Sequence, residues 1–173
     1  RERTAGVFSV LPSEKTWGRI KMRMLRDEPG SIEILLVEDS RADIRLTREV
    51  FAEINIKAAV HAVSNGEDAV DFLLKKNNYA SVPTPDLVLL DLNVPKIDGR
   101  SVLKMIKEDE KMRRIPVIVL TTSRNDEDLG TAYDYYANAY VVKPISFHDF
   151  STLIERICLF WIHEVALPEK DDD

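Results

Sequence analysis

The chain has 173 residues, of which 45% are hydrophobic and 31% charged, and this composition fits one globular domain with a single core. It contains no apolar run of the roughly 18 to 20 residues that a membrane span requires, and it does not open with a signal-peptide core. The net charge of -6 argues against a general grip on nucleic acid, and the single cysteine, Cys158, excludes an internal disulfide. We therefore expect a cytoplasmic protein that contacts neither membrane nor nucleic acid directly.

Residues 1–31 differ from the rest of the chain. They are rich in Arg and Lys, and a Pro-Gly-Ser sequence ends the segment in the manner of a linker. Apolar residues at helical spacing allow a short basic amphipathic helix there, and disorder is an equal alternative. We assign 1–31 to a basic extension, 32–165 to the main domain and 166–173 to an acidic tail.

From residue 32 onward, short apolar runs alternate with amphipathic stretches. The runs that predict strands are 32–37, 58–63, 87–90, 116–120 and 139–142. The stretches that predict helices are 42–54, 67–75, 99–108, 126–136 and 146–165. Because parallel neighbours require crossover connections, this alternation predicts an α/β fold with a doubly wound, five-stranded parallel sheet and helices on both faces.

The first predicted strand ends in two acids, Glu38 and Asp39, and the third ends in Asp91. A parallel sheet brings these strand ends to one edge, where sites in such folds occur. Three carboxylates within a few ångströms repel one another unless a cation intervenes, and oxygen ligands suit Mg²⁺. We therefore predict a Mg²⁺ site. A turn or cap is an equal alternative for Asp91, and a helix cap is one for Asp39 or Ser40.

Thr121 and Lys143 follow the fourth and fifth predicted strands. A threonine hydroxyl can donate to an oxyanion, and a lysine ammonium can reach a phosphoryl oxygen. Each residue alone has a structural alternative, since threonine is common at strand ends and most lysines are solvated. Together with the acids, they predict a site that forms an aspartyl phosphate, with the Asp91 carboxylate as nucleophile.

These strand ends, in this order and spacing, resemble the response-regulator receiver domain over about residues 32–165. The resemblance rests on Leu-Leu-Val-Glu-Asp-Ser at 35–40, Leu-Leu-Asp-Leu-Asn-Val-Pro at 89–95 with Asp-Gly at 98–99, Leu-Thr-Thr-Ser at 120–123, and Tyr-Val-Val-Lys-Pro at 140–144. It implies the same doubly wound sheet, a flavodoxin-like receiver fold.

The resemblance implies a two-component response regulator that accepts a phosphoryl group from a sensor histidine kinase on Asp91. It implies that Thr121 and Lys143 contact the phosphoryl group. The implied Mg²⁺ ligands are Glu38, Asp39, Asp91 and the backbone carbonyl of Asn93. We expect output by protein contact, and we class the chain as a phosphoacceptor switch rather than an enzyme.

The resemblance also implies a conformational switch. Tyr140 would turn inward as Thr121 moves toward the phosphate, which would change the surface formed by the fourth helix, the fifth strand and the fifth helix. An ordinary strand aromatic is the alternative for Tyr140, because a sequence cannot show two rotamers.

A closer resemblance concerns the polar segment 75–85 and the tail that contains Phe160 and Trp161. Both are similar to the small stand-alone regulators that partner bacterial phytochrome kinases, which implies a phytochrome as the kinase. The last predicted helix is apolar over one broad face. We therefore predict a homodimer through this C-terminal helix region, with a wider buried core as an equal alternative.

The residues at the strand ends disfavour two rival functions, a phosphatase and a nucleotide-binding or flavin-binding module. Phosphatases of the haloacid dehalogenase type place an acid two positions after the nucleophile, where this chain has Asn93. A nucleotide or flavin module needs a glycine-rich or hydroxyl-rich loop after the first strand, where this chain has Glu38 and Asp39. A degenerate receiver that acts only as a protein interaction module is the remaining alternative, although every expected site residue is present.

Overall fold

The computed structural model of the chain describes residues 32–54 and 57–168. The predicted basic extension, 1–31, lies outside these residues, as do positions 169–173 of the predicted acidic tail. Within the described residues, no helix combines the length and the apolar character needed to cross a membrane.

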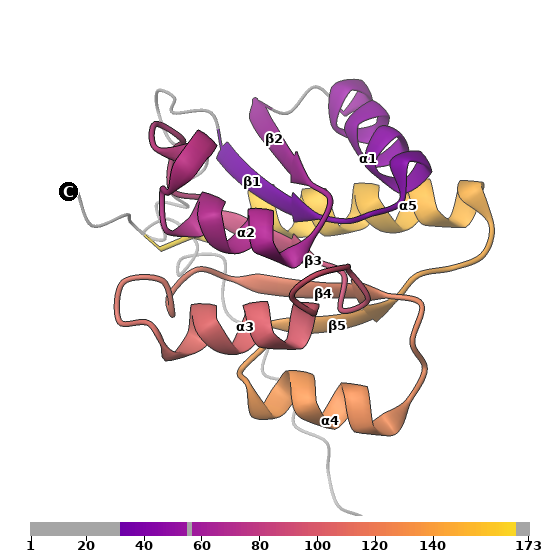
Figure 1. The fold of residues 1–173 in the computed structure, drawn as a ribbon. Coiled ribbons are helices and arrows are strands. Elements are labelled where there is room, and N and C mark those ends of the chain that lie inside the picture. The colour runs from indigo at the N-terminus through magenta and orange to yellow at the C-terminus, as the bar shows by residue number, and fades with distance from the viewer. Residues whose placement is uncertain (1–31, 55–56, 169–173) are drawn as a thin grey trace, which may run out of the picture.

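A parallel sheet of five strands forms the centre of the fold (Figure 1). The strands are β1 Ile32–Val37, β2 Ala58–Val63, β3 Leu87–Leu90, β4 Val117–Thr121 and β5 Ala139–Val142. Their order is β2-β1-β3-β4-β5, so the winding direction reverses between β1 and β3. The predicted doubly wound sheet is confirmed, and the two strands that end in acids are neighbours.

Five α-helices cover the two faces of the sheet (Figure 1). They are α1 Arg41–Glu53, α2 Gly66–Leu73, α3 Gly99–Glu108, α4 Asp126–Asp134 and α5 Phe147–Cys158. Helices α1 and α5 pack against one face, and α2, α3 and α4 against the other. Each face therefore has its own apolar core.

The central strand β3 shows why both faces are covered. All four of its residues are fully buried, with Leu87 and Leu89 in the core beneath α1 and α5, and Val88 and Leu90 in the core beneath α2 and α3. Side chains alternate between the faces of a strand, so an uninterrupted apolar run requires two apolar partners. Each such side chain contributes about 1.5–3 kcal/mol of burial free energy.

Three details differ from the predicted elements. Strand β4 begins one residue later than predicted, because Pro116 has no amide hydrogen to donate. It also ends one residue later and includes Thr121. The polar segment 75–85 contains a short 3₁₀ helix, η1 Asn77–Tyr79. The last helix is not continuous over 146–165: α5 ends at Cys158 and is followed by a π-helix, η2 Leu159–Glu164.

Glycine is required where α3 begins. A Cβ atom on Gly99 would lie 2.2 Å from the carbonyl oxygen of Asp91 and 2.6 Å from the Cα atom of Leu92. The Gly99 amide instead donates a 2.9 Å hydrogen bond to the Leu92 carbonyl. The start of α3 thus packs directly on the backbone that follows β3 and fixes the loop that carries Asp91.

Candidate functional site

The carboxyl ends of β1, β3 and β5 bring together Glu38, Asp91 and Lys143. The Lys143 Nζ atom lies 2.6 Å from Asp91 Oδ2 and also donates to Glu38 Oε2. A third carboxylate, Asp43 in the first turn of α1, lies 3.3 Å from the same ammonium. Glu38, Asp91 and Lys143 are only 3%, 6% and 6% exposed, so they form a buried charge cluster.

The charge of Lys143 is maintained by its neighbours. Burial alone would lower the pKa of Lys143, because removal from water disfavours the ammonium. The Glu38 and Asp91 carboxylates together outweigh burial and raise the pKa of Lys143 above its ordinary value. The lysine is therefore charged at neutral pH, and it compensates two carboxylates that would be costly to bury alone.

Each buried acid is also held by its own loop. Asp91 Oδ1 accepts a 2.9 Å hydrogen bond from the Asn93 amide, and Glu38 Oε1 accepts a 3.0 Å bond from the Ser40 amide. The second oxygen of each carboxylate faces Lys143. Both carboxylates thus have a fixed orientation, with one oxygen committed to the backbone and one directed into the site.

The Thr121 hydroxyl lies beside the loop that follows Asp91. Thr121 is fully buried, and its Oγ1 accepts hydrogen bonds from Asn93 Nδ2 at 3.3 Å and from the Ser123 amide at 3.2 Å. The hydroxyl is the acceptor in both bonds, so its own proton can be donated to an anion. The role of Thr121 as an oxyanion donor stays a prediction.

The two residues predicted to form the switch both contact Ser123. The Tyr140 hydroxyl donates a 3.1 Å hydrogen bond to the Ser123 carbonyl oxygen, and its half-buried ring packs against the core beneath α2 and α3. The Ser123 amide donates to Thr121. The loop between β4 and α4 therefore links Thr121 and Tyr140 directly.

The three predicted carboxylate ligands differ in burial. Glu38 and Asp91 are buried, and Asp39 is exposed. Ser40 caps α1, with its Oγ accepting from the Asp43 amide at 3.2 Å. Across the part of the chain that the structure describes, no three His, Cys, Asp or Glu side chains form a metal-holding group.

The donors that are present still suit one class of metal. Glu38 and Asp91 supply carboxylate oxygens at one edge of the sheet, and the exposed Asn93 and Asp39 lie next to them in sequence. Mg²⁺ takes one or two carboxylates and fills its other positions with water and phosphate oxygens, so it does not need a protein cage. The oxygen-only donor set fits this mode of binding.

Sequence reasoning missed two contributors to this region. Asp43 is the first, and in the sequence it looks like any acid in the first turn of a helix, where acids commonly stabilise the helix. The second is Asp128 in α4, which accepts a 2.6 Å hydrogen bond from Ser123 Oγ. No local sequence signal indicated it, because its other partner, Arg100 in α3, is distant along the chain.

Two surface features adjoin the cluster. A hollow beside Lys143 is lined by Asp43, Thr122, Arg124, Lys143, Pro144, Ile145, Ser146, Phe147 and Phe150. Because Lys143 lines it, this hollow borders the charge cluster. Its rim is apolar, with Ile145 98% and Phe147 68% exposed.

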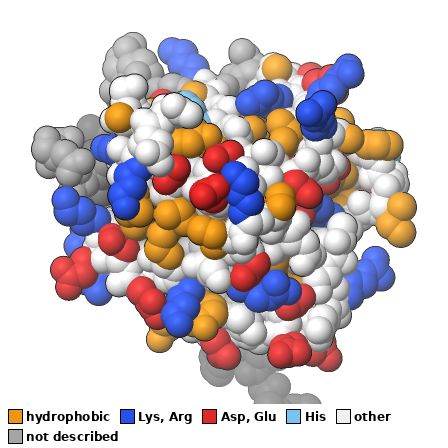
Figure 2. Space-filling model, viewed as in Figure 1, with side chains coloured by type: hydrophobic (Ala, Val, Ile, Leu, Met, Phe, Trp, Pro, Cys, Tyr) orange, Lys and Arg blue, Asp and Glu red, His pale blue; other side chains and the backbone are white. Residues whose placement is uncertain are grey.

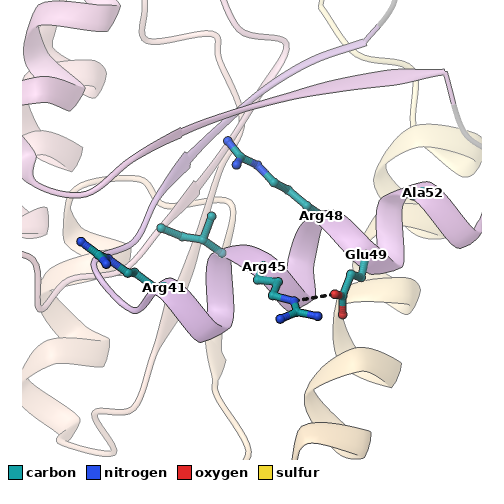
Figure 3. A pocket seen from close by; sticks show the side chains of 6 residues that line it. Arg41, Arg45, Arg48, Glu49 and Ala52 are labelled. Atoms are coloured by element: carbon teal, nitrogen blue, oxygen red, sulfur yellow. Dashed lines mark hydrogen bonds and ion pairs between the residues drawn. The ribbon is translucent and has the colours of Figure 1, made fainter.

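The second surface feature is the outer side of α1, which is basic. Acidic and basic side chains are interspersed over the face shown in Figure 2. On α1, by contrast, a shallow hollow is lined by Arg41, Ile44, Arg45, Arg48, Glu49 and Ala52 (Figure 3). Only Arg45 among these arginines is drawn with an ion pair, at 2.7 Å to Glu49. A row of arginines on a chain of net charge -6 is a local attraction for acidic groups.

Comparison with known proteins gives consistent matches. The model of the family described as "Response regulator receiver domain" matches residues 34–155, which include the ends of all five strands. Response regulator Rcp1 of Synechocystis sp. is 43% identical over 135 residues, which are 78% of this chain and 92% of that protein.

Two solved structures are also similar and share the flavodoxin-like fold. The phosphorylated cyanobacterial phytochrome response regulator RcpA has a TM-score of 0.79 and 41% identity, covering 81% of this chain and 100% of that chain. The Mn²⁺-bound form of Rcp1 has a TM-score of 0.77 and 42% identity, covering 79% of this chain and 99% of that chain.

Proposed function

Because the chain belongs to the response regulator receiver domain family of two-component signalling, we propose that it accepts a phosphoryl group on Asp91 from a sensor histidine kinase. One observation carries this proposal: the Asp91 carboxylate is buried at the carboxyl edge of the sheet, 2.6 Å from a buried ammonium. A strand-end acid that only turned the chain would not need this partner. The chain then acts as a modified switch that signals by protein contact.

We assign a role to each polar group of the site. Asp91 Oδ2 forms the new bond to phosphorus while the bond from phosphorus to the kinase histidine breaks, and the histidine nitrogen keeps the electron pair. The Asn93 amide holds Oδ1 and so orients the carboxylate. Lys143 and the Thr121 hydroxyl neutralise the charge on the phosphoryl oxygens.

Mg²⁺ is the proposed cofactor, which neutralises phosphoryl charge when it is bound. We assign its ligands to Glu38, Asp39, Asp91 and the backbone carbonyl of Asn93. The oxygen-only donors at this edge support the assignment, and the similar regulator Rcp1 has a Mn²⁺-bound form. Lys143 contacts two of these carboxylates, so a bound metal would share them with the ammonium.

The proposed output surface adjoins the switch residues. A change in the contacts of Thr121 would be passed through Ser123 to Tyr140 and α4. Large exposed side chains lie on α4 and in the turn between it and β5, namely Leu129 and Tyr133 on the helix and Tyr136 in the turn, at 38%, 52% and 77% exposure. A partner that reads these side chains would detect the state of Asp91.

A phytochrome is the proposed kinase, and the cytoplasm the proposed place of action. The similarity to proteins described as phytochrome response regulators supports this partner. We propose that the kinase approaches over the α1 arginines Arg41, Arg45 and Arg48, because α1 follows the end of β1 and these arginines attract acidic groups.

The C-terminal region is the proposed dimer interface. Leu159 and Phe160 in η2 are 41% and 55% exposed, and the Phe160 ring makes an edge-on contact with Trp161 at 5.6 Å between centroids. Adjacent exposed apolar groups favour association, and two identical patches can pair about a twofold axis.

The phosphoacceptor assignment is tested by mass spectrometry of the intact chain after incubation with Mg²⁺ and acetyl phosphate. The wild-type chain should gain one phosphoryl group, and Asp91→Asn should gain none. Asp134→Asn, which changes an exposed acid at the end of α4, serves as the control and should be labelled like the wild type. Equal labelling of Asp91→Asn and the wild type would contradict the proposal.

A further inference from the structure

A continuous series of hydrogen bonds connects Thr121 to helix α3. The Ser123 amide donates to Thr121 Oγ1 at 3.2 Å, and Ser123 Oγ donates to Asp128 Oδ2 at 2.6 Å. Arg100, in the first turn of α3, donates to Asp128 Oδ1 through Nε at 2.9 Å and through Nη2 at 2.5 Å. Arg100 on α3 and Asp128 on α4 are thereby connected to Thr121, the predicted oxyanion donor.

The outer part of this series is a partly buried ion pair between Arg100 and Asp128. Asp128 has only 13% of its side chain exposed and Arg100 33%, so solvent screens their ion pair incompletely. The Ser123 hydrogen bond, followed by the Arg100 contacts, holds the pKa of the Asp128 carboxyl below its ordinary value. Charge-assisted bonds of this kind are roughly twice as strong as neutral ones.

Ser123 is the point at which several constraints meet. Its amide contacts Thr121, its carbonyl oxygen accepts from the Tyr140 hydroxyl, and its side chain is held by Asp128. The Asn125 amide also donates to Ser123 Oγ at 3.2 Å. A displacement of Asp128 is therefore transmitted to Thr121 and Tyr140 together.

We propose that Arg100 and Asp128 are positioning residues, which act through Ser123 to hold the Thr121 hydroxyl toward the loop that carries Asp91. This inference rests on the proposed function, in which Thr121 donates to the phosphoryl group. A hydroxyl held in place loses little conformational entropy when the anion binds, whereas a loosened loop has to be ordered at that moment. Loss of either residue should weaken phosphoryl binding without removing any group that touches the anion.

The test is the affinity of the full chain for beryllofluoride in the presence of Mg²⁺, measured by calorimetry. Beryllofluoride takes the place of the phosphoryl group on an aspartate. Asp128→Asn and Arg100→Gln should each bind it about fivefold more weakly than the wild type, which is at the low end of coupling between sites. Lys104→Gln is the control, because this α3 lysine is exposed and contacts Glu108 at 3.9 Å and the Tyr135 ring at 5.6 Å, neither of which belongs to the series. It should bind like the wild type.

A double-mutant cycle separates positioning from a general structural role. In a Thr121→Ala background, Asp128→Asn should cause no further loss of affinity, because the residue through which it acts is gone. A second fivefold loss in that background would overturn the proposal. Unchanged affinity of both single variants would overturn it as well.

Amide hydrogen exchange provides a measurement that does not depend on phosphoryl binding. The Ser123 amide is protected by its bond to Thr121 Oγ1, so it should exchange about fivefold faster in Asp128→Asn than in the wild type. Equal exchange would overturn the positioning role. A wild-type chain that binds no beryllofluoride would contradict the proposed function instead, and the exchange rates would still decide whether Asp128 holds the loop.

Discussion

The Lys143 ammonium lies 2.6 Å from the Asp91 carboxylate, although the strands that precede these two residues are separated by β4. The contact therefore spans two strand spacings, past the end of β4 at Thr121. It compensates two buried carboxylates, those of Asp91 and Glu38. This relationship leads to a prediction about stability.

Lys143→Met keeps the length of the side chain and removes its charge. We expect the free energy of unfolding to fall by about 3–5 kcal/mol, because two carboxylates remain buried without a cation. Added Mg²⁺ should stabilise this variant more than the wild type, since it replaces the missing charge. Urea denaturation with and without Mg²⁺ measures both effects. Lys104→Met should change stability by less than about 0.5 kcal/mol, and an equally small loss for Lys143→Met would contradict the prediction.

A pair of glycine substitutions tests the packing of α3 on the Asp91 loop. Gly99→Ala should destabilise the chain by about 1–3 kcal/mol, because its Cβ atom would meet the Asp91 carbonyl oxygen at 2.2 Å. Gly130→Ala should stabilise it by about 0.5–1 kcal/mol, because this exposed α4 position has open space and alanine favours helix. Thermal unfolding of the two variants should therefore shift in opposite directions. Shifts in the same direction would refute the account of Gly99.

The single thiol supplies a prediction about pH. Burial raises the pKa of Cys158 from about 9 to about 12 in the folded chain. Between these values the unfolded chain loses the thiol proton first and binds fewer protons than the folded chain, so stability falls as pH rises through this window. Below about pH 9 this contribution is fully present. Urea denaturation at about pH 8 and about pH 10.5 should show a larger loss for the wild type than for Cys158→Ala.

Reactivity of the same thiol provides an independent check. At about pH 8, iodoacetamide should alkylate the folded chain far more slowly than the urea-unfolded chain, because the reactive species is the thiolate. Rapid alkylation of the folded chain would show that Cys158 is not held in the core where the structure places it, 1% exposed.

The arginines on α1 predict that the rate of phosphoryl transfer from the kinase depends on the charge of this surface. Reversal of Arg41, Arg45 and Arg48 to Glu should slow phosphoryl transfer from the kinase by about tenfold or more, because like charges would then oppose an acidic partner. Labelling by acetyl phosphate, which needs no docking, should stay within about twofold of the wild type. Arg113→Glu changes an exposed arginine before β4, at the opposite end of the sheet, and should affect neither reaction.

The proposed dimer can be tested by the mass of the chain in solution. Phe160→Asp should convert a dimer to a monomer in light scattering after size exclusion, because it places a charge in an apolar contact. Ile145→Asp is the matched control, since Ile145 is even more exposed at 98% but lies before α5. An unchanged mass of the Phe160→Asp variant would contradict the proposal that η2 forms the dimer interface.

The fold could be predicted because its determinants are local. The buried run Leu87–Leu90 and the amphipathic helices have a period that a sequence displays directly, and strand bounds such as Ala58–Val63 were predicted to the residue. The end of the last helix could not be predicted. No proline or glycine marks the change at Cys158, and the π-helix depends on packing that only the assembled fold provides.

The site could be predicted in part. Strand ends meet at one edge of a parallel sheet, so Asp91, Glu38 and Lys143 were expected together, and the structure brings them into contact. The exposure of Asp39 was not predictable, because it depends on how the chain leaves β1. The hydrogen bond between Asp128 and Ser123 was not predictable either, because a sequence contains many polar residues that could pair. Only the positions of α3 and α4 in the fold select this pair.

An ammonium has three hydrogens, and Lys143 has three carboxylate neighbours in Asp91, Glu38 and Asp43. Its capacity to donate is full. A phosphoryl group bonded to Asp91 Oδ2 turns that oxygen into an ester oxygen, so the lysine hydrogen donated to it becomes available to a phosphoryl oxygen. Glu38 and Asp43 can keep their contacts with the same ammonium. Phosphorylation would therefore exchange one partner of Lys143 and leave its contact with the first turn of α1 in place.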